Sequence, residues 1–136
     1  MTIKRTAYLL TRAAASAQAL GERDLETLGL SAREFAVLEA LAEQSPLSQT
    51  QIADILGVDR TTILKLGASL EQKGLVVRER DEQDRRAYAV ALTPDGERVR
   101  TAAFTLLANT EEQFLTNLAG DQRAQLNDLL SRIVEL

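Results

Sequence analysis

Basic and hydroxyl side chains gather between residues 60 and 72 in a pattern that suits contact with nucleic acid. Ile63, Leu66 and Leu70 recur at helical spacing and predict the buried stripe of a short helix. Guanidinium and ammonium groups donate to guanine acceptors or phosphates, hydroxyls bond phosphates or bases, and leucine can contact a thymine methyl group. The candidate DNA-contacting residues of this segment are Arg60, Thr61, Thr62, Leu64, Lys65 and Ser69.

This face has a second interpretation. Leu64 points outward if the stripe above is buried, but a rotated helix would place it in the core. Arg60 and Lys65 would then be ordinary solvated charges. The small residues Gly67 and Ala68 permit close approach to a partner, and because glycine costs a helix about 1 kcal/mol relative to alanine, we expect a packing reason for Gly67.

Another set of charged residues separates two β-rich runs. Residues 75–80 and 87–92 are typical of the strands of a hairpin, with a polar turn at 81–86. Arginines at such a tip are either solvated or available to DNA. The remaining candidate DNA-binding residues are Ser48, Gln49, Arg78, Asp84, Arg85 and Arg86.

Three helix starts position these residues. Ser31 with Glu34 and Ser48 with Gln51 each have the spacing of a capping box, and Asp59 is a further N-cap. The second and third helices are short and are joined by a tight turn containing Gly57, which predicts a helix-turn-helix. The hairpin follows directly, as a wing.

Longer helices flank this unit. An apolar-rich helix is predicted over residues 3–20, ending at Gly21. After the hairpin, Thr93 and Pro94 have the types expected at an N-cap and at the first helical position, and Gly120 separates this helix from a last one. The predicted fold class is mainly α with a short β-hairpin, a winged helix-turn-helix with terminal helices.

The composition excludes several kinds of chemistry. The 136 residues contain no cysteine and no histidine, so disulfides, thiolate zinc sites and histidine-based acid–base catalysis lose their usual residues. We therefore expect no metal and no cofactor. No run of about 18 apolar residues is present, and no apolar signal core follows the N-terminus, so we expect a cytoplasmic protein without a membrane partner. The net charge of −4 requires any DNA-binding face to arise from geometry.

Taken in order, several motifs resemble the MarR family of bacterial transcription regulators. They are Gln51-Ile52-Ala53-Asp54-Ile55-Leu56-Gly57-Val58, Leu70-Glu71-Gln72-Lys73-Gly74-Leu75-Val76, Asp84-Arg85-Arg86 and Leu92-Thr93-Pro94-Asp95-Gly96. With the flanking helices, the resemblance covers nearly the whole chain. It implies one domain, 1–136, with a winged helix-turn-helix at 31–93 and dimerisation helices at 1–22 and 94–136. The chain departs from the residues usual in the family at Leu64, Gly67 and Ala68.

The resemblance also implies partners. It implies a homodimer that binds a pseudo-palindromic double-stranded DNA operator, usually as a repressor, with Arg86 as the minor-groove residue of the wing. It further implies a small phenolic or aromatic effector that releases the DNA. Tyr8, Arg12 and Ser16 lie at i, i+4 and i+8 of the first helix, where such pockets often lie. A core edge or a dimer contact is the other interpretation, and few aromatic residues are present to stack on a ligand.

Two other functions are weighed. A winged helix that binds a protein instead of DNA would agree with the outward Leu64 and with residues 47–100, which carry nine basic and nine acidic residues. An enzyme would have to use the acidic cluster Asp81, Glu82 and Asp84, which lies in a turn that preorganises it poorly. No glycine-rich phosphate loop is present, and we therefore expect no enzyme.

Overall fold

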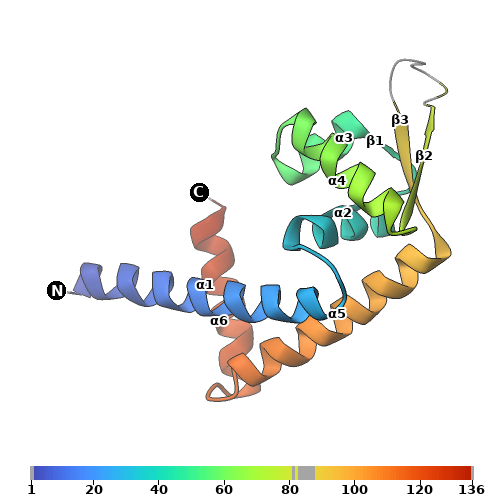
Figure 1. The fold of residues 1–136 in the computed structure, drawn as a ribbon. Helices are drawn as coiled ribbons and strands as arrows, with labels where there is room; N and C mark the ends of the chain where they lie inside the picture. Colours follow the sequence, from blue (N-terminus) through green and yellow to red (C-terminus); the bar gives the residue numbers. More distant parts are fainter. Residues whose placement is uncertain (1, 81, 83–87, 136) are drawn as a thin grey trace.

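The computed structural model describes residues 2–80, 82 and 88–135. Over these residues the chain forms six helices and one three-stranded antiparallel sheet (Figure 1). The elements are α1 (Thr2–Thr27), α2 (Ala32–Glu43), β1 (Leu47–Ser48), α3 (Gln49–Leu56), α4 (Arg60–Gln72), β2 (Val76–Arg80), β3 (Tyr88–Leu92), α5 (Pro94–Phe114) and α6 (Gly120–Val134). The predicted fold class is confirmed.

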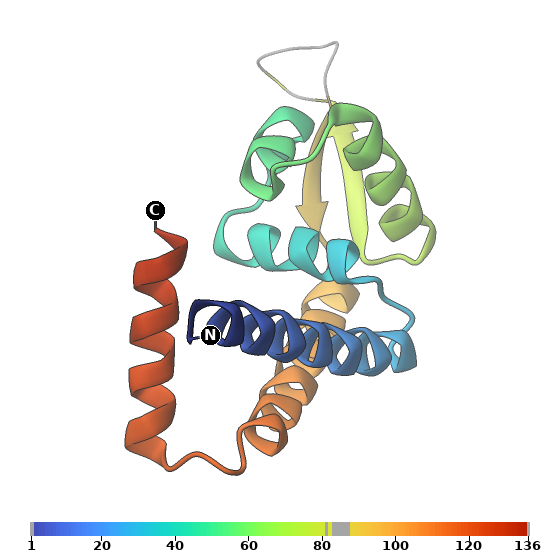
Figure 2. The same cartoon turned by 90° about the vertical axis from the view of Figure 1, so that its left-hand side faces the viewer.

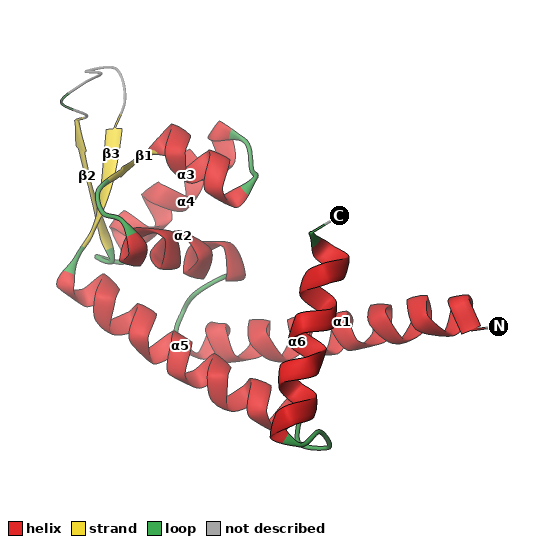
Figure 3. Ribbon diagram, turned by 180° about the vertical axis from the view of Figure 1, so that it is seen from behind, coloured by secondary structure: helices red, strands yellow, loops and turns green. Residues whose placement is uncertain are grey.

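Two parts of the molecule are distinct. The helices α2, α3 and α4 and the sheet pack together, while α1 and α5 cross beneath them (Figures 1 and 2). The N-terminal half of α1 extends beyond α5 (Figure 3). Helix α6 turns back from the end of α5 and lies to one side of the other helices (Figure 2). None of the described helices is both long and apolar enough to span a bilayer.

The predicted end of the first helix at Gly21 is wrong, because α1 continues to Thr27. Gly21 packs against α5, where an added Cβ would lie 3.6 Å from Leu107 Cδ2. This packing outweighs the weak helix propensity of glycine, about 1 kcal/mol. The helix ends shortly before Gly29, whose φ of 71° is readily adopted only without a side chain.

The predicted helix starts are confirmed. The Ser31 and Ser48 hydroxyls accept from the backbone N–H groups three residues later, and Glu34 and Gln51 return the bond. Asp59 accepts from the Thr62 N–H. Gly57 is left-handed, with φ 67°, and makes the turn of the helix-turn-helix.

The sheet contains a strand that the sequence did not predict. β1 pairs antiparallel with β3, Leu47 opposite Val90 and Ser48 opposite Ala89. The expected hairpin is present, with Val76 opposite Leu92 and Arg80 opposite Tyr88. β1 is two residues long, too short to show alternation, and its pairing with β3 is non-local.

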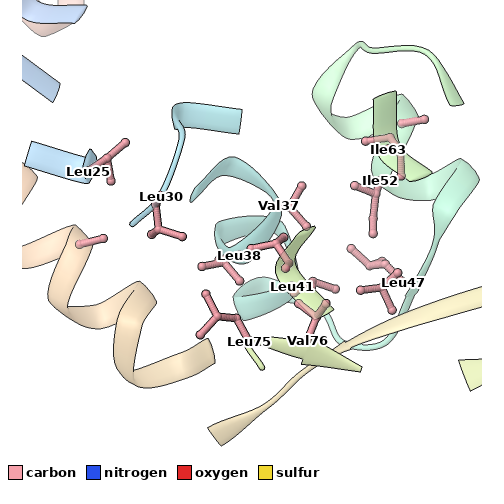
Figure 4. Packing of buried hydrophobic residues seen from close by; sticks show 14 residues of the cluster. Leu25, Leu30, Val37, Leu38, Leu41, Leu47, Ile52, Ile63, Leu75 and Val76 are labelled. Atoms are coloured by element: carbon pink, nitrogen blue, oxygen red, sulfur yellow. The ribbon is translucent and has the colours of Figure 1, made fainter. Parts of the chain in front are cut away.

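The hydrophobic core joins α2 to the helix-turn-helix and the sheet (Figure 4). Its most buried side chains include Leu38 and Leu41 of α2, Ile52 of α3, Ile63 of α4 and Val76 of β2. Burying one such side chain is worth about 1.5–3 kcal/mol. The core fixes the rotation of α4, with Ile63 inside and Leu64 42% exposed. The alternative interpretation of Leu64 as a core residue is therefore wrong.

Two glycines respond oppositely to an added methyl group. At Gly96 of α5, a Cβ would lie 2.0 Å from the carbonyl oxygen of Leu75, the residue before β2, so only glycine allows α5 to start this close to the backbone. At Gly67 of α4 a Cβ would meet Arg78 Cδ at 3.7 Å, an ordinary contact.

We predict that Gly96→Ala lowers the free energy of unfolding by about 2–3 kcal/mol or more, because backbone must move to admit the methyl group. Gly67→Ala is the matched control, since it makes the same change in a helix without a clash. It should be neutral or stabilising by up to about 1 kcal/mol. Urea denaturation of both variants measures the difference, and equal losses would contradict the packing described at Gly96.

Candidate nucleic-acid interface

The outer face of α4 carries exposed basic, hydroxyl and apolar side chains. Arg60, Thr61, Leu64 and Lys65 are exposed, and so is Ala68. Within the described part of the chain, neither Arg60 nor Lys65 makes an ion pair. Both charges are thus available to an outside partner.

Thr62 has a local role. Its hydroxyl donates to the carboxylate of Asp59, and its backbone N–H donates to the same carboxylate at 3.1 Å. The hydrogen bonds from the Thr62 hydroxyl and backbone hold the pKa of Asp59 below its usual value. Thr62 therefore anchors the first turn of α4, and its half-buried side chain lies to the side of the outer face.

Ser69 faces α2, where Glu34 is the centre of a small network. The Ser69 hydroxyl donates to Glu34 Oε2 at 3.0 Å, and Lys73 Nζ donates to the same oxygen at 2.8 Å. Lys73 Nζ also donates to the Gly29 carbonyl at 2.6 Å, and the Ser31 N–H donates to Glu34 Oε1 at 2.9 Å. This network joins α4 to the start of α2 and to the loop before it.

The ionisation of Glu34 follows from these contacts. Burial alone would raise its pKa, but hydrogen bonds from Lys73, Ser31 and Ser69 outweigh burial and hold the pKa below its usual value. Glu34 is therefore a charged, fully bonded carboxylate between the two helices.

The two candidates at the start of α3 lie inward of the surface. Ser48 is half-buried and its hydroxyl caps α3. Gln49 is only 3% exposed, and its Nε2 has no hydrogen-bond partner among the described residues. The side chain of Gln49 does not reach the outer surface.

We define the wing as β2, β3 and the residues between them. Arg78 of β2 connects the wing to α4. Arg78 Nη2 lies 3.0 Å from Glu71 Oε1, and the Arg78 N–H donates to Glu71 Oε2 at 3.2 Å. The guanidinium lies 5.9 Å from the centre of the Tyr88 ring. The bond from Arg78 holds the pKa of Glu71 below its usual value. The Arg78 side chain lies against α4 at Gly67, but an added Cβ would make only an ordinary contact of 3.7 Å with Arg78 Cδ, so the expected packing reason for Gly67 is not found. Asp84, Arg85 and Arg86 lie outside the described residues.

A basic residue that sequence reasoning missed lies near this face. Arg33 of α2 is exposed and lines a cleft of about 650 Å³ with Lys65 and Thr62 of α4. A basic residue in the first turn of α2 was the available signal, but only the packing of α2 on α4 brings it beside Lys65.

Tyr8, Arg12 and Ser16 share an exposed face of α1, with the Arg12 guanidinium 5.9 Å from the centre of the Tyr8 ring. None of them lines a second cavity, which we call the apolar groove. The apolar groove has a volume of about 640 Å³ and lies between α1, α5 and α6, with Phe35 and Glu39 of α2 also in its lining. The sequence-predicted ligand residues and the apolar groove thus use different faces of α1.

Comparisons with known proteins agree on one family. The family model described as MarR family matches residues 28–87. A "putative transcriptional regulatory protein for hcr operon" from Thauera aromatica is 32% identical over 107 residues, which are 79% of this chain and 64% of that protein. The structure of the PcaV transcriptional regulator from Streptomyces coelicolor is 30% identical, with a TM-score of 0.81, and covers 96% of this chain and 95% of its own. BpsR from Bordetella bronchiseptica, whose DNA binding is described as regulated by 6-hydroxynicotinic acid, is 25% identical, with a TM-score of 0.81 and coverage of 96% and 93%.

The Glu34 network predicts a specific acid sensitivity. A carboxylate with a lowered folded-state pKa contributes stability that is complete above its unfolded pKa, near 4.5, and is lost as pH falls through the folded pKa. Glu34→Gln should cost about 1–3 kcal/mol at neutral pH. It should also flatten the decline in the free energy of unfolding between about pH 5 and pH 3.

Urea unfolding at several pH values measures both effects. Glu43→Gln, at the exposed end of α2, is the control and should follow the wild-type pH profile. Identical pH profiles for Glu34→Gln and the wild type would contradict a stabilising ionised Glu34.

Proposed function

Because this chain belongs to the MarR family of transcriptional regulators, we propose that two copies of it bind double-stranded DNA and regulate transcription. The observation that carries the proposal is the outer face of α4, where Arg60 and Lys65 are exposed without an ion pair in the described chain. A helix-turn-helix places such a helix in the major groove.

Each side chain of this face has a role in the proposed complex. Arg60 and Thr61 lie at the N-terminal end of α4, where the helix approaches base edges. Lys65 and Arg33 line one cleft and contact phosphates. The exposed Leu64 contacts a thymine methyl group. Thr62, Ser69 and Gln49 hold or support the helices and make no proposed base contact, while the Ser48 hydroxyl remains a phosphate ligand.

The wing supplies the second contact. The family resemblance supports a place for Arg86 in the minor groove, with Asp84 and Arg85 beside it, because the potential of a narrow minor groove attracts arginine. Arg78 sets the direction of the wing through Glu71 and adds positive charge at its base.

Dimerisation is supported by apolar surface that the single chain leaves open. Leu9 of α1 and Leu129, Ile133 and Val134 of α6 are each more than half exposed. The N-terminal half of α1 and all of α6 project from the body (Figures 1 and 3). A second copy covers these faces in the proposed dimer, through residues 1–22 and 94–136. Each protomer then presents residues 31–93 to one half-site, with half-sites roughly 10 bp apart.

The regulator acts as a repressor that a small molecule releases. The support is by relationship, since PcaV has been crystallised with its natural ligand and BpsR is described as responding to 6-hydroxynicotinic acid. Exposed Leu64, and Ile55 of α3 at 59% exposure, favour a protein-binding winged helix as the second candidate function.

Selection of duplexes from a random pool at about 100 mM salt tests the proposal, because bound phosphates make affinity salt-dependent. A two-fold symmetric motif is the expected result. The absence of any enriched sequence would favour the protein-binding alternative.

With the selected duplex, Lys65→Ala should weaken binding and reduce the slope of log K against log salt by about 0.9 per lost phosphate contact. Arg98→Ala removes the same charge from an exposed site on α5 and is the matched control. Titration at three salt concentrations gives both slopes, and equal slopes for the wild type and Lys65→Ala would remove Lys65 from the interface.

The dimer has its own test. Ile133→Asp places a charge in the exposed apolar face of α6 and should shift the protein toward the monomer in sedimentation experiments. Ala124→Asp adds the same charge on the opposite side of α6 and should leave the dimer intact. A protein that sediments as a monomer before any substitution would contradict the dimer itself.

A further inference from the structure

The outer face of α4 combines two apolar side chains with two positive charges. Leu64 is 42% exposed, and Ala68, one helical turn further along the same side, is exposed as well. We call these two residues the apolar strip. Arg60 lies one turn before Leu64, and Lys65 is its neighbour in the chain. Because the proposed dimer uses residues 1–22 and 94–136, a second copy leaves the apolar strip open.

The packing of α4 prevents the apolar strip from turning inward. Ile63 and Leu70 are buried in the core, and the Ser69 hydroxyl is bonded to α2. At about 100° per residue, these contacts direct Leu64 and Ala68 away from the body of the molecule. The apolar strip therefore leaves water only when a partner covers it, and its burial there is favourable.

The adjacent charges favour nucleic acid as that partner. Arg60 and Lys65 make no ion pair within the described residues. A polyanion pairs with both cations while it covers the apolar strip, whereas an uncharged apolar surface would bury them unpaired at a high cost. In the major groove, the apolar group that distinguishes base pairs is the C5 methyl of thymine.

The apolar strip cannot read the polar edges of bases. Neither Leu64 nor Ala68 has a side-chain donor or acceptor, so selectivity beneath them depends on whether a methyl group is present. The two residues lie about 6 Å apart along the helix axis, and base pairs are spaced about 3.4 Å apart, so the strip is long enough for two neighbouring base pairs. The C5 methyl of 5-methylcytosine points into the same groove as that of thymine.

We propose that the apolar strip reads the C5 methyl groups of pyrimidines in the major groove. The operator is then bound through thymine methyl groups, and 5-methylcytosine substitutes for thymine at the same positions. This inference rests on the proposed function and specifies the DNA that it acts on. It also adds a form of regulation, because methylation of cytosine at such a position strengthens binding without changing the base pair.

Deoxyuridine tests the strip, because it differs from thymidine only in lacking the C5 methyl group. Each thymine of the selected duplex is replaced in turn, in both half-sites together, and the affinity of the full chain is measured by fluorescence anisotropy at one salt concentration. Beneath the strip, affinity should fall about threefold per methyl group. The loss should be about tenfold for both half-sites, which corresponds to about 1.4 kcal/mol.

The converse experiment adds a methyl group. A cytosine paired with guanine is placed at a position that responded to deoxyuridine, and it is compared with 5-methylcytosine at that position. Methylation should raise the affinity by about the factor that separates thymine from uracil. The two comparisons use different base pairs and share only the methyl group, so equal factors assign the effect to that group.

Substitution then locates the reader on α4. Leu64→Ala should reduce the tenfold ratio of thymine to uracil affinity to about twofold or less. Ile55→Ala is the matched control, because it removes a similar side chain, 59% exposed, from α3. The ratio should stay at its wild-type value in this variant.

Equal affinity for the thymine and uracil duplexes at every position overturns the proposal and leaves the proposed function standing. A ratio that Leu64→Ala leaves unchanged also overturns it, since the methyl group then acts through the shape of the DNA. A selected motif without thymine contradicts the inference alone. A selection that enriches no duplex contradicts the proposed function and this inference together.

Discussion

One buried carboxylate determines how α4 is held against α2. Glu34 caps the helix on which it lies, accepts from the Ser69 hydroxyl and pairs with Lys73, so a single side chain satisfies α2 and fixes α4 against it. A charge in this position is stable only when its hydrogen bonds are made. Ile63 and Leu70 of α4 are buried in the core. Rotation of α4 would therefore break both these apolar contacts and the ionic contacts with Glu34.

This constraint divides the side chains on and next to α4 into those that hold the helix in place and those that remain open to a partner. Ser69, Lys73 and Glu71 are occupied with α2 and with the wing, while Arg60, Thr61, Leu64 and Lys65 remain open. Arg78 makes the corresponding joint to the wing through Glu71 and Tyr88. Helix α4 and the base of the wing thus form one preorganised unit, which would lower the entropic cost of the proposed DNA binding.

The terminal helices α1, α5 and α6 are packed less completely than α4. Their apolar faces are only partly covered within one chain, which leaves Leu129, Ile133 and Val134 exposed on α6. Between α1, α5 and α6, however, the same helices enclose a groove that touches α2.

The sequence by itself determined the features that depend on near neighbours. Capping at Ser31, Ser48 and Asp59 and the left-handed turn at Gly57 involve residues within a few positions of each other, so their types and spacing were sufficient. The helical stripe of Ile63, Leu66 and Leu70 also gave the rotation of α4 correctly.

Only the tertiary structure decided the features that join distant segments. The pairing of β1 with β3, the bond from Ser69 to Glu34 and the burial of Gln49 depend on how helices and strands pack. The same holds for the continuation of α1 past Gly21, where packing on α5 outweighs local propensity, and for the meeting of Phe35 with Phe104 and Phe114 around one cavity. Local chemistry specifies elements, but contacts between residues far apart in the chain arise only when those elements bury their apolar faces together.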